Sequence, residues 1–317
     1  MPILKYENNS FPLGTVPNGM AQLQVTWGDV LWAALTVGRP GLFHVFRHGL
    51  ASVHEAVFRV TMVRMALEQR GGHSSEFQRT QLFKEMDPTE KGAVNYFLGM
   101  LVCKLFAAKL LDAPWSLRLD VFRNQLDPRV LAGGSRPDMV AQANNTSQWH
   151  AFECKGRASP PGNQEKAKAK SQAQRLVSVN GTNCTLQIGA ITFFKGDTLA
   201  FYWEDPEPDS DDPIKLPETD NAWGSYYGPA VQLIRSREVS ARTERPDGIS
   251  PLTASIEELD VSIEIHPKIA EDLYAGNWQQ ARECAISLEQ QMQANGFQPD
   301  GLRVVPGESW TQPLNLP

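Results

Sequence analysis

The chain has few of the features that mark secreted, zinc-stabilised or membrane proteins. Its four cysteines (103, 154, 184 and 284) are scattered, with no CxxC pair, which argues against a zinc ribbon or a disulfide framework and fits a reducing compartment. Residues 1–9 lack the apolar core of a signal peptide. The longest mostly apolar run, residues 92–103, is too short to span a bilayer. We therefore expect a cytoplasmic protein without membrane contact.

An overall excess of basic charge is also absent. The 317 residues include 30 Lys and Arg against 36 Asp and Glu, and 41% of them are apolar, as in an ordinary soluble globular protein. The charge is unevenly spread, however, because residues 155–175 hold six basic residues and one acid, whereas residues 204–220 hold eight acids and one lysine. The chain has no P-loop, dinucleotide-binding fingerprint or serine nucleophile elbow. Any enzymatic function must therefore rest on other residues.

The centre of the chain has the pattern of two strands joined by a polar turn at residues 144–147. If the hairpin is symmetric about that turn, Asp138 lies directly opposite Glu153, and Val140 lies opposite Ala151. Directly opposed residues have Cβ atoms about 5 Å apart, and like charges placed there destabilise the pair. The sequence therefore predicts two carboxylates in an arrangement that needs a compensating positive charge.

Lys155 extends this cluster. Side chains of a strand alternate between its faces, so Glu153 and Lys155 share one face while Phe152 and Cys154 point to the other. A divalent cation would explain the paired carboxylates, since Mg²⁺ is bound by one or two carboxylates together with water and phosphate oxygens. The alternative is a surface hairpin whose charged residues line one face, with Lys155 paired to a carboxylate.

At these residues the chain resembles the PD-(D/E)xK nuclease superfamily, which has the restriction-endonuclease-like fold. Its pattern is Pro-Asp on one strand and (Asp/Glu)-x-Lys on the next, here Pro137-Asp138 and Glu153-Cys154-Lys155. The resemblance covers the middle third of the chain and implies Mg²⁺-dependent phosphodiester hydrolysis, with Mn²⁺ as a substitute. It assigns Asp138, Glu153 and the Cys154 carbonyl to the metal. It assigns Lys155 to the scissile phosphate or the attacking water.

The resembled family often places a further acidic residue on the helix before the sheet. Glu90 fits this role because it shares a helical stripe with Val94 and Phe97, the face expected to pack on the sheet. We therefore predict Glu90 as a fourth catalytic and metal-binding residue, with Glu85 as the second candidate. Residues 87–90 have a capping-box spacing as well, in which Glu90 would fold back to the helix start. The sequence leaves both roles open.

A basic segment follows the motif, where a phosphate backbone would lie. Arg157 continues the face of Glu153 and Lys155 if the strand persists, and residues 166–177 have the composition of a helix. The superfamily often carries a supporting Gln or Lys on this helix. The predicted nucleic-acid contacts are Arg157, Lys166, Lys168, Lys170, Gln172 and Arg175. The alternative is a solvated helix face.

The expected elements around the motif are a helix, three strands, a helix and two strands. This order is that of the αβββαβ core of the resembled fold with one extra strand. We therefore expect an α/β protein with a restriction-endonuclease-like core at residues 87–204. An N-terminal arm and helical region would occupy residues 1–86. An acidic linker or loop at 205–222 would lead to an α+β extension at 223–317.

The resemblance favours DNA as the substrate, although the same residues would serve RNA cleavage and the sequence does not separate the two. Because no ATPase or sequence-reading module is recognisable, we expect a partner subunit or a homodimer. A role in restriction or phage defence follows from the habits of the family. The alternative function is a non-cleaving nucleic-acid-binding or scaffold subunit that keeps the fold. The intact set of Asp138, Glu153 and Lys155 counts against this alternative.

Overall fold

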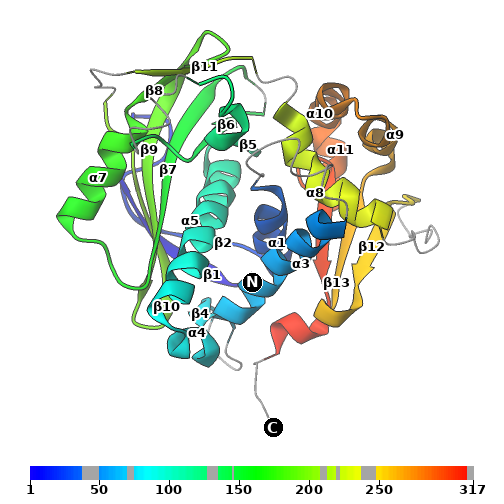
Figure 1. Ribbon diagram of the computed structural model, residues 1–317, viewed down its shortest axis with the longest axis horizontal. Helices are drawn as coiled ribbons and strands as arrows, with labels where there is room; N and C mark the ends of the chain where they lie inside the picture. Colours follow the sequence, from blue (N-terminus) through cyan, green and yellow to red (C-terminus); the bar gives the residue numbers. More distant parts are fainter. Residues whose placement is uncertain are drawn as a thin grey trace.

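The structure is a computed structural model, and it describes residues 1–37, 50–69, 75–126, 135–144, 146–207, 213–218, 222–236 and 248–312. It is an α/β protein. Within these residues, eleven strands form one mixed sheet, and three further strands form a second, antiparallel sheet. Figure 1 shows the two sheets on opposite sides of a layer of helices.

The large sheet has a main path of seven strands in the order β2-β1-β10-β9-β7-β6-β5. Its parallel neighbours are β1 with β10 and β7 with β9, and the other pairs on the path are antiparallel. The strands on the path are β1 (Ile3–Asn9), β2 (Gly19–Gln24), β5 (Trp115–Arg118), β6 (Met139–Gln142), β7 (Trp149–Arg157), β9 (Thr182–Lys195) and β10 (Thr198–Glu204). Off the path lie β3 (Leu67–Glu68), β4 (Gln78–Arg79), β8 (Leu176–Val179) and β11 (Ile214–Leu216).

Two helices, α5 (Pro88–Leu110) and α7 (Asn163–Ala173), cover opposite faces of this sheet at β7 and β9 (Figure 1). Glycines permit both contacts. A Cβ at Gly156 of β7 would lie 1.6 Å from the Asn95 carbonyl oxygen of α5. A Cβ at Gly189 of β9 would lie 2.9 Å from the backbone nitrogen of Lys170 in α7. A side chain at position 189 would therefore point toward α7, and this identifies the face of the sheet that α7 covers.

Helix α5 is the central apolar helix of the molecule. Its start is set by Asp87, which accepts hydrogen bonds from the Thr89 and Glu90 amides, and by Pro88 at the first helical position. The helix is long and apolar enough to cross a membrane by length and composition alone. Two thirds of its most apolar window, 67%, is buried inside the protein, however. This burial is what the core helix of a packed domain requires.

The remaining helices join the large sheet to the small one. Helices α1 (Trp27–Thr36), α3 (Leu50–Ala66) and α8 (Trp223–Ser236) pack together, and α1 also packs on the small sheet (Figure 1). The small sheet consists of β12 (Leu252–Ile256), β13 (Val261–Ile265) and β14 (Leu302–Pro306). The other helical elements are α4 (Gln81–Glu85), η1 (Leu119–Phe122), η3 (Glu257–Leu259), α9 (Pro267–Ala275), α10 (Trp278–Ser287), α11 (Glu289–Ala294) and η4 (Glu308–Thr311).

A buried polar network connects the two sides of this layer. Lys104 of α5 has no exposed surface and donates to the Thr36 carbonyl at 2.9 Å and to the Tyr226 hydroxyl at 3.0 Å. The Tyr226 hydroxyl donates in turn to the Asp300 carboxylate at 2.7 Å, and Trp32 donates to the same oxygen at 2.7 Å. Because a buried charge is costly unless it is paired, these contacts fix the C-terminal region against α5.

The α/β class predicted from the sequence is confirmed, and the structure adds detail to two outer parts. Within the N-terminal region 1–86, β1 and β2 extend the large sheet, and β1 pairs in parallel with β10. The segment 205–222 is more than a linker in its described part. Asp205 is buried and accepts from the Gln187 amide at 2.7 Å, and β11 pairs with β8.

Candidate active site

The predicted register of the central hairpin is confirmed. Met139 pairs with Phe152 and Val140 pairs with Ala151 in the antiparallel ladder of β6 and β7. Asp138 directly precedes β6, and its amide donates to the Phe152 carbonyl at 3.0 Å. This register places Asp138 directly opposite Glu153, so the two side chains lie on the same face of the sheet.

The backbone and side chain of Asp138 are both held by neighbouring strands. Its carbonyl accepts from the Leu119 amide at 3.0 Å, beside the end of β5. Its Oδ2 accepts from the Cys154 amide at 2.9 Å. Burial raises the pKa of Asp138, although the hydrogen bond from Cys154 and the charges of Lys155 and Arg118 oppose the rise. One oxygen of Asp138 is therefore committed to the protein.

Glu153 lies in the middle of the sheet and has no exposed surface. Its neighbour in β9 is Gly189, so its side chain lies on the face that α7 covers. Burial, followed by the negative charge of Asp138, raises the pKa of Glu153 to about 8. The Lys155 ammonium forms an ion pair with Glu153 Oε1. Burial lowers the pKa of Lys155, but the charge and hydrogen bond of Glu153, together with the charges of Asp138 and Cys154, leave that pKa raised.

The carboxylates of this site fit a divalent cation. Both Glu153 oxygens are buried, and apart from the Lys155 ion pair at Oε1 neither accepts a hydrogen bond of normal geometry from the residues that the structure describes. A buried carboxylate beside a second acid is costly to ionise, and a cation beside Asp138 and Glu153 would reduce that cost. No cluster of three or more His, Cys, Asp or Glu residues suited to a metal lies within the described ranges. Mg²⁺ does not require one, since it keeps several waters.

The prediction that Glu90 belongs to this site is wrong. Glu90 is exposed at the first turn of α5, and its carboxylate accepts from the Asp87 amide at 3.4 Å, which completes a capping box. The capping interaction prevails because the first turn of α5 projects into solvent, where the helix start has amides to satisfy. Glu85, the second candidate, is also exposed and accepts from Gln81 at 2.6 Å.

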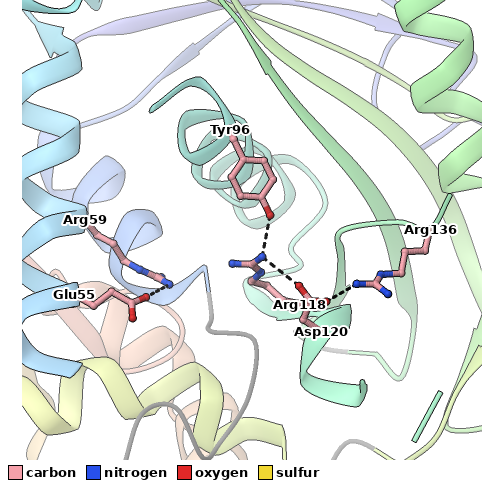
Figure 2. A network of polar contacts seen from close by, with 6 residues as sticks. All are labelled: Glu55, Arg59, Tyr96, Arg118, Asp120 and Arg136. Atoms are coloured by element: carbon pink, nitrogen blue, oxygen red, sulfur yellow. Dashed lines mark hydrogen bonds and ion pairs between the residues drawn. The ribbon is translucent and has the colours of Figure 1, made fainter. Parts of the chain in front are cut away.

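Arginines that the sequence did not single out flank the site (Figure 2). Arg118, the last residue of β5, donates to the Tyr96 hydroxyl at 2.9 Å and pairs with Asp120 at 3.4 Å. Asp120 also pairs with Arg136, two residues before Asp138, at 2.6 Å. The guanidinium of Arg118 lies close enough to Asp138 to lower its pKa. This chain of contacts holds the segment that carries Asp138 and gives its border positive charge.

A third arginine approaches the same border from another helix. Arg59 of α3 pairs with Glu55 at 2.9 Å, and Figure 2 shows its guanidinium extending toward Arg118. Burial, followed by the positive charge of Arg118, lowers the pKa of Arg59 to about 10. Each of these two guanidinium groups has an acidic partner, Glu55 for Arg59 and Asp120 for Arg118. These residues lie on elements far apart in the sequence, so no local motif indicates them.

The basic residues after the motif have different surroundings in the structure. Strand β7 persists through Arg157, which meets the condition for Arg157 to continue the face of Glu153 and Lys155, and Arg157 pairs with Glu165 at 3.0 Å. Lys168 is exposed on α7, whereas Lys170 pairs with Glu204 at 3.4 Å. Lys166 lies over the ring of Tyr202, with Nζ 3.7 Å from the centroid. The six residues therefore do not form one uniform solvated face.

Lys168, Gln172 and Arg175 do not share one helix face, because α7 ends at Ala173 and Gln172 is buried. Arg175 lies beyond the helix and donates to the Ser135 carbonyl, which holds the segment before Asp138. Gln172 lies one turn after Ala169, which packs against Gly189. Its Oε1 is buried without a hydrogen-bond partner among the described residues. Gln172 therefore belongs to the side of α7 that covers the Glu153 face.

In comparisons with known proteins, the chain matches no family model, no curated protein and no solved structure. The resemblance to the PD-(D/E)xK superfamily accordingly rests on the residues and geometry of Asp138, Glu153 and Lys155 alone.

Proposed function

We propose that this protein is a metal-dependent nuclease that hydrolyses phosphodiester bonds, with DNA as the favoured substrate. The observation that carries the proposal is the pairing of Asp138 with the buried, hydrogen-bond-deficient carboxylate of Glu153, beside Lys155. A structural ion pair would not need the second acid, since one carboxylate suffices for one ammonium. Two acids and one lysine on a single face are the set that the nuclease pattern requires.

The roles of the residues follow from their positions. Asp138 and Glu153 would hold Mg²⁺ or Mn²⁺, with the Cys154 carbonyl as a further ligand by resemblance to the family. The bound ion lowers the pKa of water and neutralises negative charge on the phosphate. Lys155, whose side chain is 36% exposed, would turn from Glu153 to the scissile phosphate once the ion compensates that carboxylate. Arg118 and Arg136 would keep the segment of Asp138 in place.

The arrangement of the core elements also supports the proposal. Helix α5 precedes the three strands β5, β6 and β7, and α7 follows them before β9, which lies parallel to β7. This is the element order of the restriction-endonuclease-like core, which we propose for residues 87–204, with β8 and β10 as two additional strands. A cytoplasmic location, a partner subunit or homodimer, and a role in restriction or phage defence belong to the same proposal.

A cleavage assay with a matched pair of variants tests the function. Supercoiled, linear and single-stranded DNA, and single-stranded RNA, are incubated with wild type in Mg²⁺, Mn²⁺ or EDTA. We expect cleavage in either metal and none in EDTA. Asp138→Asn, which keeps an oxygen acceptor for the Cys154 amide, should be inactive, whereas Asp272→Asn on the distant helix α9 should be active.

Two results would contradict the proposal. Cleavage by Asp138→Asn, or cleavage by wild type in EDTA, would remove the metal from the mechanism. Binding of nucleic acid without cleavage in any metal would favour the alternative function, a non-cleaving nucleic-acid-binding or scaffold subunit.

A further inference from the structure

A pocket of ≈ 510 Å³ lies on the same face of the large sheet as the candidate active site. Residues paired across neighbouring strands share a face. Lys155 pairs with Ile191, which pairs with Tyr202, and Arg157 pairs with Phe193, which pairs with Ala200. Phe193, Ala200 and Tyr202 line the pocket. Its floor is therefore the continuation of the catalytic face, two strands beyond β7.

The separation between the pocket and the site follows from the sheet. Neighbouring strands lie about 4.8 Å apart, so the backbone of Tyr202 is about 10 Å from that of Lys155 along the same row. Helix α7 covers the face between them, where Ala169 packs with Ile191 and Tyr202. A strand of nucleic acid with one phosphate at Lys155 would therefore have to pass the N-terminal end of α7, beside Pro160, Pro161 and Lys166, to place a nearby nucleotide in the pocket.

The lining of the pocket has the chemistry that recognises a nucleobase. Phe193 is half-buried and offers aromatic surface, whereas Tyr202 is buried and Lys166 lies over its ring at 3.7 Å. Lys166 and Lys195 bring positive charge to the lining, where a phosphate would be attracted, while Lys5 pairs with Glu76. Sites for single strands combine stacking platforms with cationic grooves in this way.

The base in such a pocket has to be unpaired. Pro160, Pro161 and Met20 line the pocket together with residues of the sheet. A base that is stacked and paired within a duplex cannot lie flat on this lining, because its faces and edge are already occupied. The site size also suits one nucleotide, since ligand pockets of 300–1,000 Å³ bury most of a small ligand.

We infer that this pocket binds an unpaired nucleobase of the strand whose phosphate lies at Asp138 and Glu153. The substrate class is accordingly a single strand, a frayed end or a duplex with an extruded base. The identity of the ligand rests on the proposed function, whereas the pocket itself does not.

Binding measured in EDTA tests the inference without cleavage. The affinities of fluorescent oligothymidylate and of a duplex of equal length are compared by anisotropy. Wild type should bind the single strand more tightly. Ala200→Phe, which fills the pocket from its floor, should weaken single-strand binding about tenfold, in keeping with the loss of one stacked base. Duplex binding should not change. Ala275→Phe at the exposed end of α9 is the matched control.

A second variant keeps the test decisive if Ala200→Phe does not fold. Lys166→Ala leaves the floor intact and should weaken single-strand binding. It should also reduce the slope of log affinity against log salt by about 0.7, the value for one cation on a single strand. Lys268→Ala, an exposed lysine of α9, should do neither. Equal binding of single strand and duplex by wild type, or an unchanged strand preference in Ala200→Phe, would overturn the inference.

These outcomes are separate from those of the proposed function. A protein that cleaves DNA but keeps its strand preference in Ala200→Phe would retain the nuclease assignment and lose the pocket. A protein that binds single strands through the pocket but cleaves nothing would retain the pocket and lose the nuclease assignment.

Discussion

Replacing Glu153 by glutamine should stabilise the metal-free protein at pH 8. The carboxylate has no exposed surface, faces Asp138, and accepts no hydrogen bond of normal geometry from the described residues. Its ionised form is therefore penalised in the folded state. Glutamine has nearly the same shape without the charge, so it removes the penalty while it keeps the packing.

The magnitude follows from the pKa of Glu153, which is about 8 in the folded protein against an ordinary value of 4.5. Below pH 4.5 both states hold the proton and no penalty exists. Between pH 4.5 and 8 the unfolded state ionises first, so the folded state loses stability as the pH rises. The difference between these two pKa values corresponds to a loss of at most about 5 kcal/mol in the free energy of unfolding. The buried glutamine amide and the loss of the Lys155 ion pair offset part of it, which leaves a gain of about 1–3 kcal/mol.

Urea denaturation in EDTA at pH 5 and pH 8 measures this effect, with Glu271→Gln on the exposed surface of α9 as the control. Glu153→Gln should be more stable than wild type at pH 8, with little gain at pH 5. In a second series at pH 8, with Mn²⁺ in place of EDTA, the ion should stabilise wild type and not the variant, because only wild type binds the ion in its folded state. No gain at pH 8, or an equal gain at both pH values, would refute the interpretation of Glu153 as a strained carboxylate.

Three further predictions concern other parts of the fold. Burial lowers the pKa of His150 to about 4, so the free energy of unfolding of wild type should fall by about 2–3 kcal/mol as the pH drops from 6.5 to 4. Urea titrations should show that His150→Leu lacks this loss. Equal acid sensitivity of variant and wild type would contradict the prediction. Glu90→Ala should lower the melting temperature by a few degrees through loss of the capping box and leave cleavage unchanged, whereas a loss of cleavage would restore Glu90 to the site. Neutralising Lys166 and Lys168 together should flatten the salt dependence of duplex binding by nearly two units of slope, and an unchanged slope would mean that α7 does not follow the phosphate backbone.

The part of the site that depends on local geometry could be predicted from the sequence. The turn at residues 144–147 sets the register of the hairpin, and the period of two along a strand then places Glu153 and Lys155 on one face. The burial of His150 on the other face follows from the same alternation. These predictions depend only on residues near each other in the chain.

The wrong or missing predictions depend on tertiary contacts. The helical stripe of Glu90 is genuine, but whether its first turn reaches the sheet is decided by how α5 packs, and Gly99 and Gly156 bring β7 to the middle of the helix instead. Arg59 and Arg118 meet because α3 and β5 lie beside α5, 59 residues apart in sequence. Likewise, no local pattern indicates that β1 pairs with β10.

The central claim is that Asp138 and Glu153 bind the catalytic metal while Lys155 acts on the phosphate. Calorimetric titration of Mn²⁺ beside single-turnover cleavage tests it on Asp138→Ala and Lys155→Ala, with circular dichroism to verify that both fold. We predict that Asp138→Ala loses both metal binding and cleavage. Lys155→Ala should keep metal binding and lose cleavage by about 10²–10³-fold, as expected for a group that stabilises transition-state charge. Cleavage by Lys155→Ala at near the wild-type rate would contradict the account.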